Sequence, residues 1–176
     1  ASKRYTDCVI QPIRKKNEFQ ALCSLIDAYQ APPKATPIFL ADRGFHSLNV
    51  FAHAIENQEY FLVRATDVKM ERLLDMDLPS NQESFDVQIH RILTRTHSKK
   101  KWLHPELADQ YKFIYKNVSF DYIIPGQQDE YHIRLRVLRF KLSSGAYENI
   151  ITNLPKEEFP MEEIMNRAEE LYFEGA

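Results

Sequence analysis

The residues best suited to chemistry surround an acid at the end of a short apolar run, Pro37-Ile38-Phe39-Leu40-Ala41-Asp42-Arg43-Gly44-Phe45. Four consecutive apolar residues after a proline predict a buried strand, and Asp42 lies where this strand leaves the core. The carboxyl ends of buried strands commonly carry the sites of α/β folds, and carboxylate oxygen is the ligand that Mg²⁺ prefers. The alternative is that Asp42 only ends the strand in a turn or pairs with Arg43.

Two basic stretches are candidates for contact with phosphate groups. Lysine and arginine neutralise phosphates, and an aromatic neighbour can stack on a base or a sugar. A charged run is equally typical of a solvated loop, so both interpretations stay open. The first stretch holds Arg91, Arg95, His97, Lys99, Lys100, Lys101 and Trp102, and the second holds His132, Arg134 and Arg136.

Composition sets the limits within which these residues act. The chain has 176 residues, of which 44% are hydrophobic and 27% are charged, as in an ordinary globular protein. A net charge of -2 gives no overall attraction to nucleic acid or membrane, so any DNA contact must come from a local patch. No apolar run reaches membrane-spanning length. Cys8 and Cys23 lie among apolar neighbours, and we expect both to be buried free thiols of a cytoplasmic protein.

The first third of the sequence alternates between strand and helix patterns. Asn17 is a predicted N-cap, and the apolar residues that follow it recur at helical spacing. Ser47 is expected to cap a second helix. Strands that alternate with helices of this length indicate a mostly parallel sheet. The expected elements are a strand at Tyr5–Gln11, a helix from Asn17 to about Tyr29, a strand before Asp42, a helix at Ser47–Asn57 and a strand at Tyr60–Arg64.

The middle of the sequence has a different pattern, because apolar and polar residues mostly alternate there. In the longest alternating run His132, Arg134 and Arg136 share one face, which predicts a half-exposed antiparallel strand with a basic side. The residues Ser143-Ser144-Gly145 predict a hairpin turn. The elements expected after Asp67 are a short helix, strands at 85–92, 112–118, 131–142 and 147–152, and a terminal helix that begins near Phe159.

Several short motifs together resemble a known family. The catalytic region of bacterial insertion-sequence transposases is similar to this chain over most of its length. These are DDE enzymes whose last motif is Tyr-x2-Arg-x3-Glu-x6-Lys. The motifs that carry the resemblance are Tyr5-Thr6-Asp7, Gln11-Pro12, Asn17-Glu18, Ala41-Asp42-Arg43-Gly44-Phe45, Phe61-Leu62-Val63-Arg64-Ala65, Leu138-Arg139-Phe140 and Thr152-Asn153-Leu154.

The resemblance implies an α/β fold with an RNase H-like mixed sheet, flanking helices and a β-rich insertion. We expect residues 1–67 to form part of the catalytic core, 68–146 the insertion, and 147–176 the return to the core. The implied activity is cleavage and transfer of DNA strands at transposon ends, with Mg²⁺ or Mn²⁺ held between carboxylates. Asp42 matches the second catalytic acid and metal ligand of the family, and Arg43 would lie near phosphate.

The sequence departs from the family pattern at both ends. The first catalytic acid of the family belongs to a strand upstream of Tyr5, and the third would fall beyond Ala176. Tyr172 is similar to the tyrosine of the last motif, but position 175 is Gly rather than Arg, and residues 170–175 also resemble a protease-recognition tag. We therefore expect an incomplete sheet whose first strands are missing, a fragment that is inactive alone, and a possible homodimer through exposed strand edges.

Three other polar residues receive structural interpretations. His46 follows the Asp42 turn, His53 lies on a predicted helix, and Glu148 belongs to an apolar strand. A single histidine is a weak indication of metal, because metal sites need several converging ligands. The second candidate function is a non-catalytic DNA-binding or assembly module, or a transposase relic, built from the same basic stretches.

Overall fold

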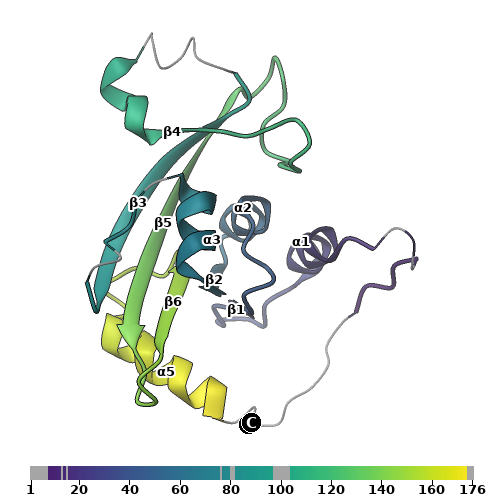
Figure 1. Cartoon of the computed structure of the whole chain (residues 1–176). Helices are drawn as coiled ribbons and strands as arrows, with labels where there is room; N and C mark the ends of the chain where they lie inside the picture. Colours follow the sequence, from purple (N-terminus) through teal and green to yellow (C-terminus); the bar gives the residue numbers. More distant parts are fainter. Residues whose placement is uncertain are drawn as a thin grey trace.

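The computed structural model describes residues 8–12, 14, 16–75, 77–79, 82–96 and 104–173. Helices flank one mixed sheet with the strand order β1-β2-β6-β5-β3-β4 (Figure 1). The strands are β1 (Ile38–Ala41), β2 (Tyr60–Ala65), β3 (Phe85–Thr94), β4 (Tyr111–Phe113), β5 (Glu130–Lys141) and β6 (Tyr147–Thr152). The helices are α1 (Glu18–Ala28), α2 (Leu48–Glu56), α3 (Asp67–Leu74), the 3-10 helix η2 (Pro105–Gln110) and α5 (Met161–Phe173).

The order of the strands follows from their connections. β1 and β2 are parallel, and α2 makes the crossover that parallel strands require. β5 and β6 form the predicted hairpin, in which Gly145 adopts a φ of 86° that favours glycine. β6 also pairs with β2, so the long β3–β5 pair extends the sheet that begins at β1.

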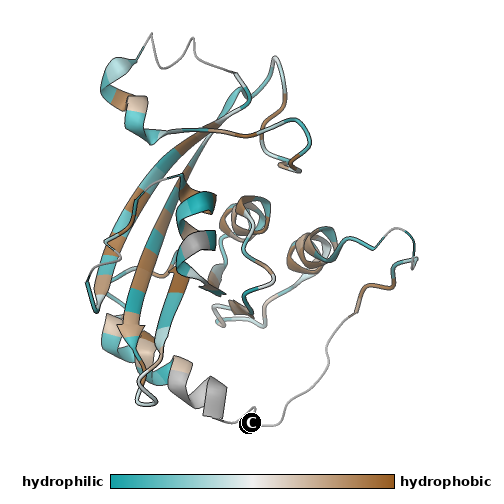
Figure 2. Cartoon of the chain, in the orientation of Figure 1, coloured by the Kyte–Doolittle hydropathy of each residue, from teal (hydrophilic) through white to brown (hydrophobic). Residues whose placement is uncertain are grey.

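Two apolar clusters lie on the two faces of the sheet. On one face, Ile133 and Val137 of β5 share a cluster with Phe51 of α2 and Phe61 of β2. On the other face, α5 covers Leu138 and Phe140 of β5 together with Ile150 of β6. Brown and teal alternate along β3 and β5 in Figure 2, as expected where successive side chains point to opposite faces.

Several local predictions are confirmed. The Asn17 side chain accepts a hydrogen bond from the Gln20 backbone N–H at 3.2 Å and caps α1. The expected Ser47 cap is confirmed in position only, because Ser47 occupies the N-cap position of α2 but its side chain makes no capping bond. Cys23 is buried as expected, and burial is the main cause that raises the pKa of its thiol to about 12. Within the part of the chain that the structure describes, no helix has the length and apolar character needed to cross a bilayer.

Other expectations at the N-terminal side are wrong. Residues 8–11 of the predicted Tyr5–Gln11 strand are not a strand, and residues 5–7 lie outside the described residues. Ile10 is 92% exposed and Cys8 is exposed, because this segment packs beside no strand. The Gln11 side chain instead bonds to the backbone of Asn17. The β1 strand is not fully buried either, since it pairs with β2 on one side and leaves Leu40 52% exposed.

The strand expected at 112–118 is shorter than predicted. β4 pairs with Ile92–Thr94 at the end of β3 and stops at Phe113. The chain then turns, and the Val118 N–H bonds to the Tyr115 carbonyl oxygen. The alternating pattern continues past the end of the pairing with β3, so the pattern alone predicts a strand that is too long.

Candidate active site

Asp42 directly follows β1, at the carboxyl end of the parallel β1–β2 pair. Its Oδ1 accepts the backbone N–H of Arg43 at 2.7 Å, and its backbone oxygen accepts the N–H of Phe45 at 2.9 Å. These bonds form the predicted turn. The Asp42 side chain nevertheless stays 73% exposed, so its carboxylate remains accessible to a ligand.

Two arginines connect Asp42 to a buried acid. Arg64, near the end of β2, places Nη1 3.5 Å from Asp42 Oδ1 and Nη2 2.6 Å from Glu148 Oε2. Arg43 donates to both Glu148 oxygens at 3.2 and 3.3 Å. The Glu148 side chain is only 1% exposed, and a buried carboxylate is strongly unfavourable unless cations and hydrogen bonds compensate it.

Glu148 is a strand residue of β6, as the sequence indicated, but its connection to Asp42 was missed. The available signal was an acid inside the apolar strand Tyr147–Thr152, since a fully buried glutamate needs a paired partner. The sequence alone could not name the two arginines, because they lie 84 and 105 residues away along the chain.

Another acid at this edge is already engaged. Asp67 begins α3 shortly after β2 and forms an ion pair with Arg139 of β5. It also accepts a hydrogen bond from the Asn149 side chain at 2.7 Å. Asp67 therefore links α3 to β5 and β6, and its Oδ1 accepts both of these bonds.

Asp42 is the one described residue of this site whose side chain suits a divalent metal ion and remains accessible to it. Its exposed carboxylate has the donor chemistry of one Mg²⁺ ligand. Among the described residues, no group of three His, Cys, Asp or Glu side chains could hold a metal ion. The near neighbour His46 places Nδ1 2.6 Å from the Arg43 carbonyl oxygen, so it stabilises the turn.

The structure separates the candidate DNA-binding residues. Arg43 pairs with Glu148, and Arg95 donates to the carbonyl oxygens of Tyr115, Val118 and Phe120, where it holds the loop after β4. Arg134 is exposed on β5. Lys99, Lys100, Lys101 and Trp102 lie outside the described residues, as does His97.

The expectation that Arg136 lies on an exposed basic face is wrong. Arg136 is 2% exposed, and it donates to Asp86 Oδ1 at 2.8 Å and to Oδ2 at 2.9 Å. It also donates to the carbonyl oxygen of Phe159 at 2.7 Å. The segment that leads into α5 covers this part of the face and buries the guanidinium.

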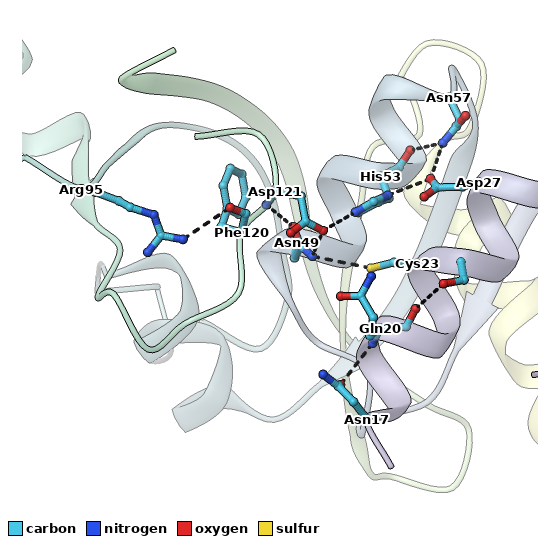
Figure 3. A network of polar contacts seen from close by, with 11 residues as sticks. Asn17, Gln20, Cys23, Asp27, Asn49, His53, Asn57, Arg95, Phe120 and Asp121 are labelled. Atoms are coloured by element: carbon cyan, nitrogen blue, oxygen red, sulfur yellow. Dashed lines mark hydrogen bonds and ion pairs between the residues drawn. The ribbon is translucent and has the colours of Figure 1, made fainter. Parts of the chain in front are cut away.

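A second polar network joins α1 and α2 to the loop before β5 (Figure 3). His53 Nδ1 lies 2.7 Å from Asp27 Oδ1, and His53 Nε2 lies 2.9 Å from Asp121 Oδ2. Asn49 donates to Asp121 Oδ2 at 2.9 Å and accepts the Asp121 N–H at 2.9 Å. The structure thus gives His53 the structural role that the sequence indicated.

The charge of this network shifts two pKa values in opposite directions. Burial alone would lower the pKa of His53, but its hydrogen bonds to Asp27 and Asp121 outweigh burial and raise the pKa above 6.5. Burial would raise the pKa of Asp121, but the bonds from Asn49 and His53 outweigh it and lower the pKa below 3.8. Both shifts favour the charged histidine–aspartate pair.

The six-stranded mixed sheet and its flanking helices are consistent with an RNase H-like domain of the DDE type. The chain matches the family model described as the transposase DDE domain over residues 2–169. The chain therefore belongs to this family, as a DDE transposase of the insertion-sequence type, and its chemistry is that of a transposition-related nuclease. No individual curated protein and no solved structure matches it. The resemblance and the fold class predicted from the sequence are confirmed.

Proposed function

We propose that Asp42 is a catalytic acid and metal ligand in DNA strand cleavage and strand transfer at transposon ends. The observation that carries the proposal is the exposed Asp42 carboxylate at the carboxyl end of β1 in a transposase DDE domain. Mg²⁺ or Mn²⁺, when bound with further acids, would activate a nucleophilic oxygen and stabilise the charge that develops on phosphate.

The residues around Asp42 have a positioning role in this proposal. Glu148 holds the Arg64 guanidinium beside Asp42, and the turn bond from the Arg43 N–H fixes the Asp42 side chain. The paired charges of Arg43, Arg64, Glu148 and Asp42 cancel, so a phosphate would approach a nearly neutral edge.

We also propose that this chain does not cleave DNA by itself. DDE chemistry uses three acids, and in the described residues only Asp42 matches one of them. The same observation favours a second candidate, a DNA-binding or assembly module without catalysis. DNA contacts in both cases would come from Arg43, Arg95, Arg134 and the residues Lys99, Lys100, Lys101 and Trp102, since the net charge of -2 gives no general attraction.

The deciding experiment uses a full-length transposase that contains this chain. Strand transfer of a labelled transposon end is measured with Mg²⁺, with Mn²⁺ and with EDTA, for the wild type and for Asp42→Asn. We expect the variant to lose at least about 100-fold in rate while its affinity for DNA is retained. Undiminished strand transfer by Asp42→Asn would remove Asp42 from the mechanism, and metal-independent DNA binding without strand transfer by the wild type would favour the second candidate.

A homodimer and a cytoplasmic location complete the proposal. In the described sheet β1 has β2 as its one neighbour, and an open strand edge can pair with another chain. Cys8 and Cys23 are free thiols, as is usual in the reducing cytoplasm. Light scattering coupled to gel filtration tests the dimer, and a monomer mass at all concentrations would contradict it.

A further inference from the structure

Two histidines and an arginine form a polar patch on the face of the sheet that α5 covers only in part. The antiparallel register sets His90 of β3 opposite Arg134 of β5, and Ile92 opposite His132. The three polar side chains share one face, and the two imidazoles lie diagonally across the strand pair. His90 Nε2 is 3.1 Å from His132 Nδ1. We call these three residues the histidine patch.

A groove lies directly beside the histidine patch. Its volume is about 430 Å³, and it lies between the β3–β5 pair and the segment that follows β6. His132 and Arg134 are exposed, and His90 is half-buried. The lining combines polar side chains, those of Gln88, His90, Arg134, Arg136 and Asn153, with apolar residues of β3, β5 and the segment after β6.

Arg134 differs from the other arginines of β5 in its partners. Arg136 is bonded to Asp86, and Arg139 is paired with Asp67. Among the residues that the structure describes, no carboxylate lies within ion-pair distance of Arg134. Its charge is therefore available to a ligand in the groove.

The electrostatics of the patch favour a bound anion. Burial lowers the pKa of His90, and the positive charges of His132, Arg134 and Arg91 lower it further, against the opposing hydrogen bond from Gln110. The neutral form of His90 is thus favoured while the groove lacks a negative charge. An anion beside the His90 imidazole would oppose this effect and favour the protonated form of His90.

A metal ion is the competing ligand, because two nitrogens 3.1 Å apart could bind one cation together. Two observations argue against it. Within the described ranges there is no third His, Cys, Asp or Glu that would complete such a site. The Arg134 guanidinium, opposite His90, would also repel a cation.

We propose that His90, His132 and Arg134 form a binding site for a backbone phosphate of DNA. The proposal rests on the DNA substrate proposed above, and it adds His90, which belongs to neither of the basic stretches found in the sequence. Because phosphate binding favours the protonated form of His90, the affinity for DNA rises as the pH falls. Uptake of one proton changes the affinity by at most about tenfold per pH unit.

The test measures the binding of a fluorescent DNA duplex to the intact chain by anisotropy, from about pH 8 to about pH 5.5. The variants are His90→Gln with His132→Gln, and Arg134→Gln alone. The matched controls are His104→Gln and Arg167→Gln, which replace an exposed residue just before η2 and an exposed residue of α5. Circular dichroism at each pH verifies that every variant is folded.

The wild type and both controls are expected to bind several-fold more tightly at the lower pH, whereas the double histidine variant loses most of this dependence. Arg134→Gln is expected to reduce the slope of log Kd against log salt by about 1, as for the loss of one phosphate contact. Identical pH profiles for the wild type and the histidine variant would overturn the site while leaving the proposed function intact. Failure of the wild type to bind DNA at any pH would overturn both.

A second arm distinguishes DNA phosphate from free phosphate. Inorganic phosphate is titrated while the histidine ring signals are followed by ¹H–¹⁵N NMR. Small changes in the histidine chemical shifts with inorganic phosphate, and the same changes with DNA at a far lower concentration, support the DNA site. Saturation by inorganic phosphate with no response to DNA would overturn the proposal in favour of a small-anion site.

Discussion

The guanidinium group of Arg64 bridges the carboxylates of Asp42 and Glu148, at 3.5 Å from Asp42 Oδ1 and 2.6 Å from Glu148 Oε2. The Asp42 side chain is 73% exposed and the Glu148 side chain is 1% exposed. One arginine therefore connects an acid in solvent to an acid in the core. The surroundings of the proposed catalytic acid depend on a residue of β6, far along the chain.

Replacing Glu148 by Gln is expected to lower the free energy of unfolding by about 2 kcal/mol, because two guanidinium groups lose their buried partner. Urea denaturation measures this change. The control is Glu106→Gln, whose exposed side chain contacts His104, and we expect a change within about 0.5 kcal/mol. Equal losses of unfolding free energy for the two substitutions would show that the buried ion pairs of Glu148 stabilise the protein no more than the exposed contact of Glu106.

Arg136 and Arg134 are two residues apart on β5 and are expected to respond very differently to replacement by Met. Arg136→Met leaves the Asp86 carboxylate without its bidentate partner and should cost about 3 kcal/mol. Arg134→Met removes an exposed cation and should cost less than about 0.5 kcal/mol. The midpoints of urea unfolding compare the two variants directly.

In Arg136→Met the buried Asp86 carboxylate keeps only the partly exposed Lys156, 3.3 Å away, as a partner among the described residues. Adding Asp86→Asn should therefore restore part of the lost stability, since it removes this poorly compensated charge. If Arg134→Met were the more destabilising of the two, the burial of Arg136 described above would be wrong.

The same pair of arginines shows the limit of the sequence pattern. Alternation along residues 131–140 correctly assigned Ile133, Leu135 and Val137 to one face. It could not show that the approach to α5 covers the opposite face at Arg136 but not at Arg134. Which part of a face is covered depends on contacts between distant segments, and no local pattern encodes them.

His53 is expected to make the stability of the protein depend on pH. The pKa of His53 is higher in the folded protein than the ordinary 6.5. Its contribution to the free energy of unfolding is therefore fully present below pH 6.5 and is lost as the pH rises through the pKa of the folded state. Unfolding free energies measured from about pH 6 to about pH 8.5 should decrease. In His53→Gln the dependence should be weaker, with a loss of about 2 kcal/mol at the lower pH.

His104→Gln is the matched control for His53, because His104 is an exposed histidine that pairs with an exposed glutamate. A wild-type stability that is flat across the neutral range would contradict the role assigned to His53.

Asp121 acts in the acidic pH range. Its lowered pKa stabilises the folded protein above pH 3.8, and this stabilisation is lost on acidification.

The two cysteines are expected to differ in reactivity toward a maleimide. Cys8 is exposed, whereas Cys23 is buried with a pKa raised to about 12, mainly by burial. Mass spectrometry of the native protein at neutral pH should show one label, on Cys8, and unfolding in urea should allow a second. Rapid labelling of Cys23 in the native protein would mean that α1 opens readily.

The positions of most elements were predictable because their signals are local. The Asn17 cap, the proline before β1 and the Ser143–Gly145 turn each mark a boundary within a few residues. The exposure of Cys8 was not predictable in this way, because burial requires a neighbouring layer that the local sequence does not reveal. For the same reason Asp42 could be singled out from sequence, whereas its connection through Arg64 to Glu148 could not.

The central position of β6 has a mechanical consequence. Thr152 of β6 is in register with Leu62 of β2 on one side and with Arg136 of β5 on the other. Hydrogen-bonded ladders thus run without a break from β1, which Asp42 directly follows, to the strands that carry His90 and His132. Asp42 and the histidine patch therefore belong to one continuous sheet, and the strand pairing fixes their positions relative to each other.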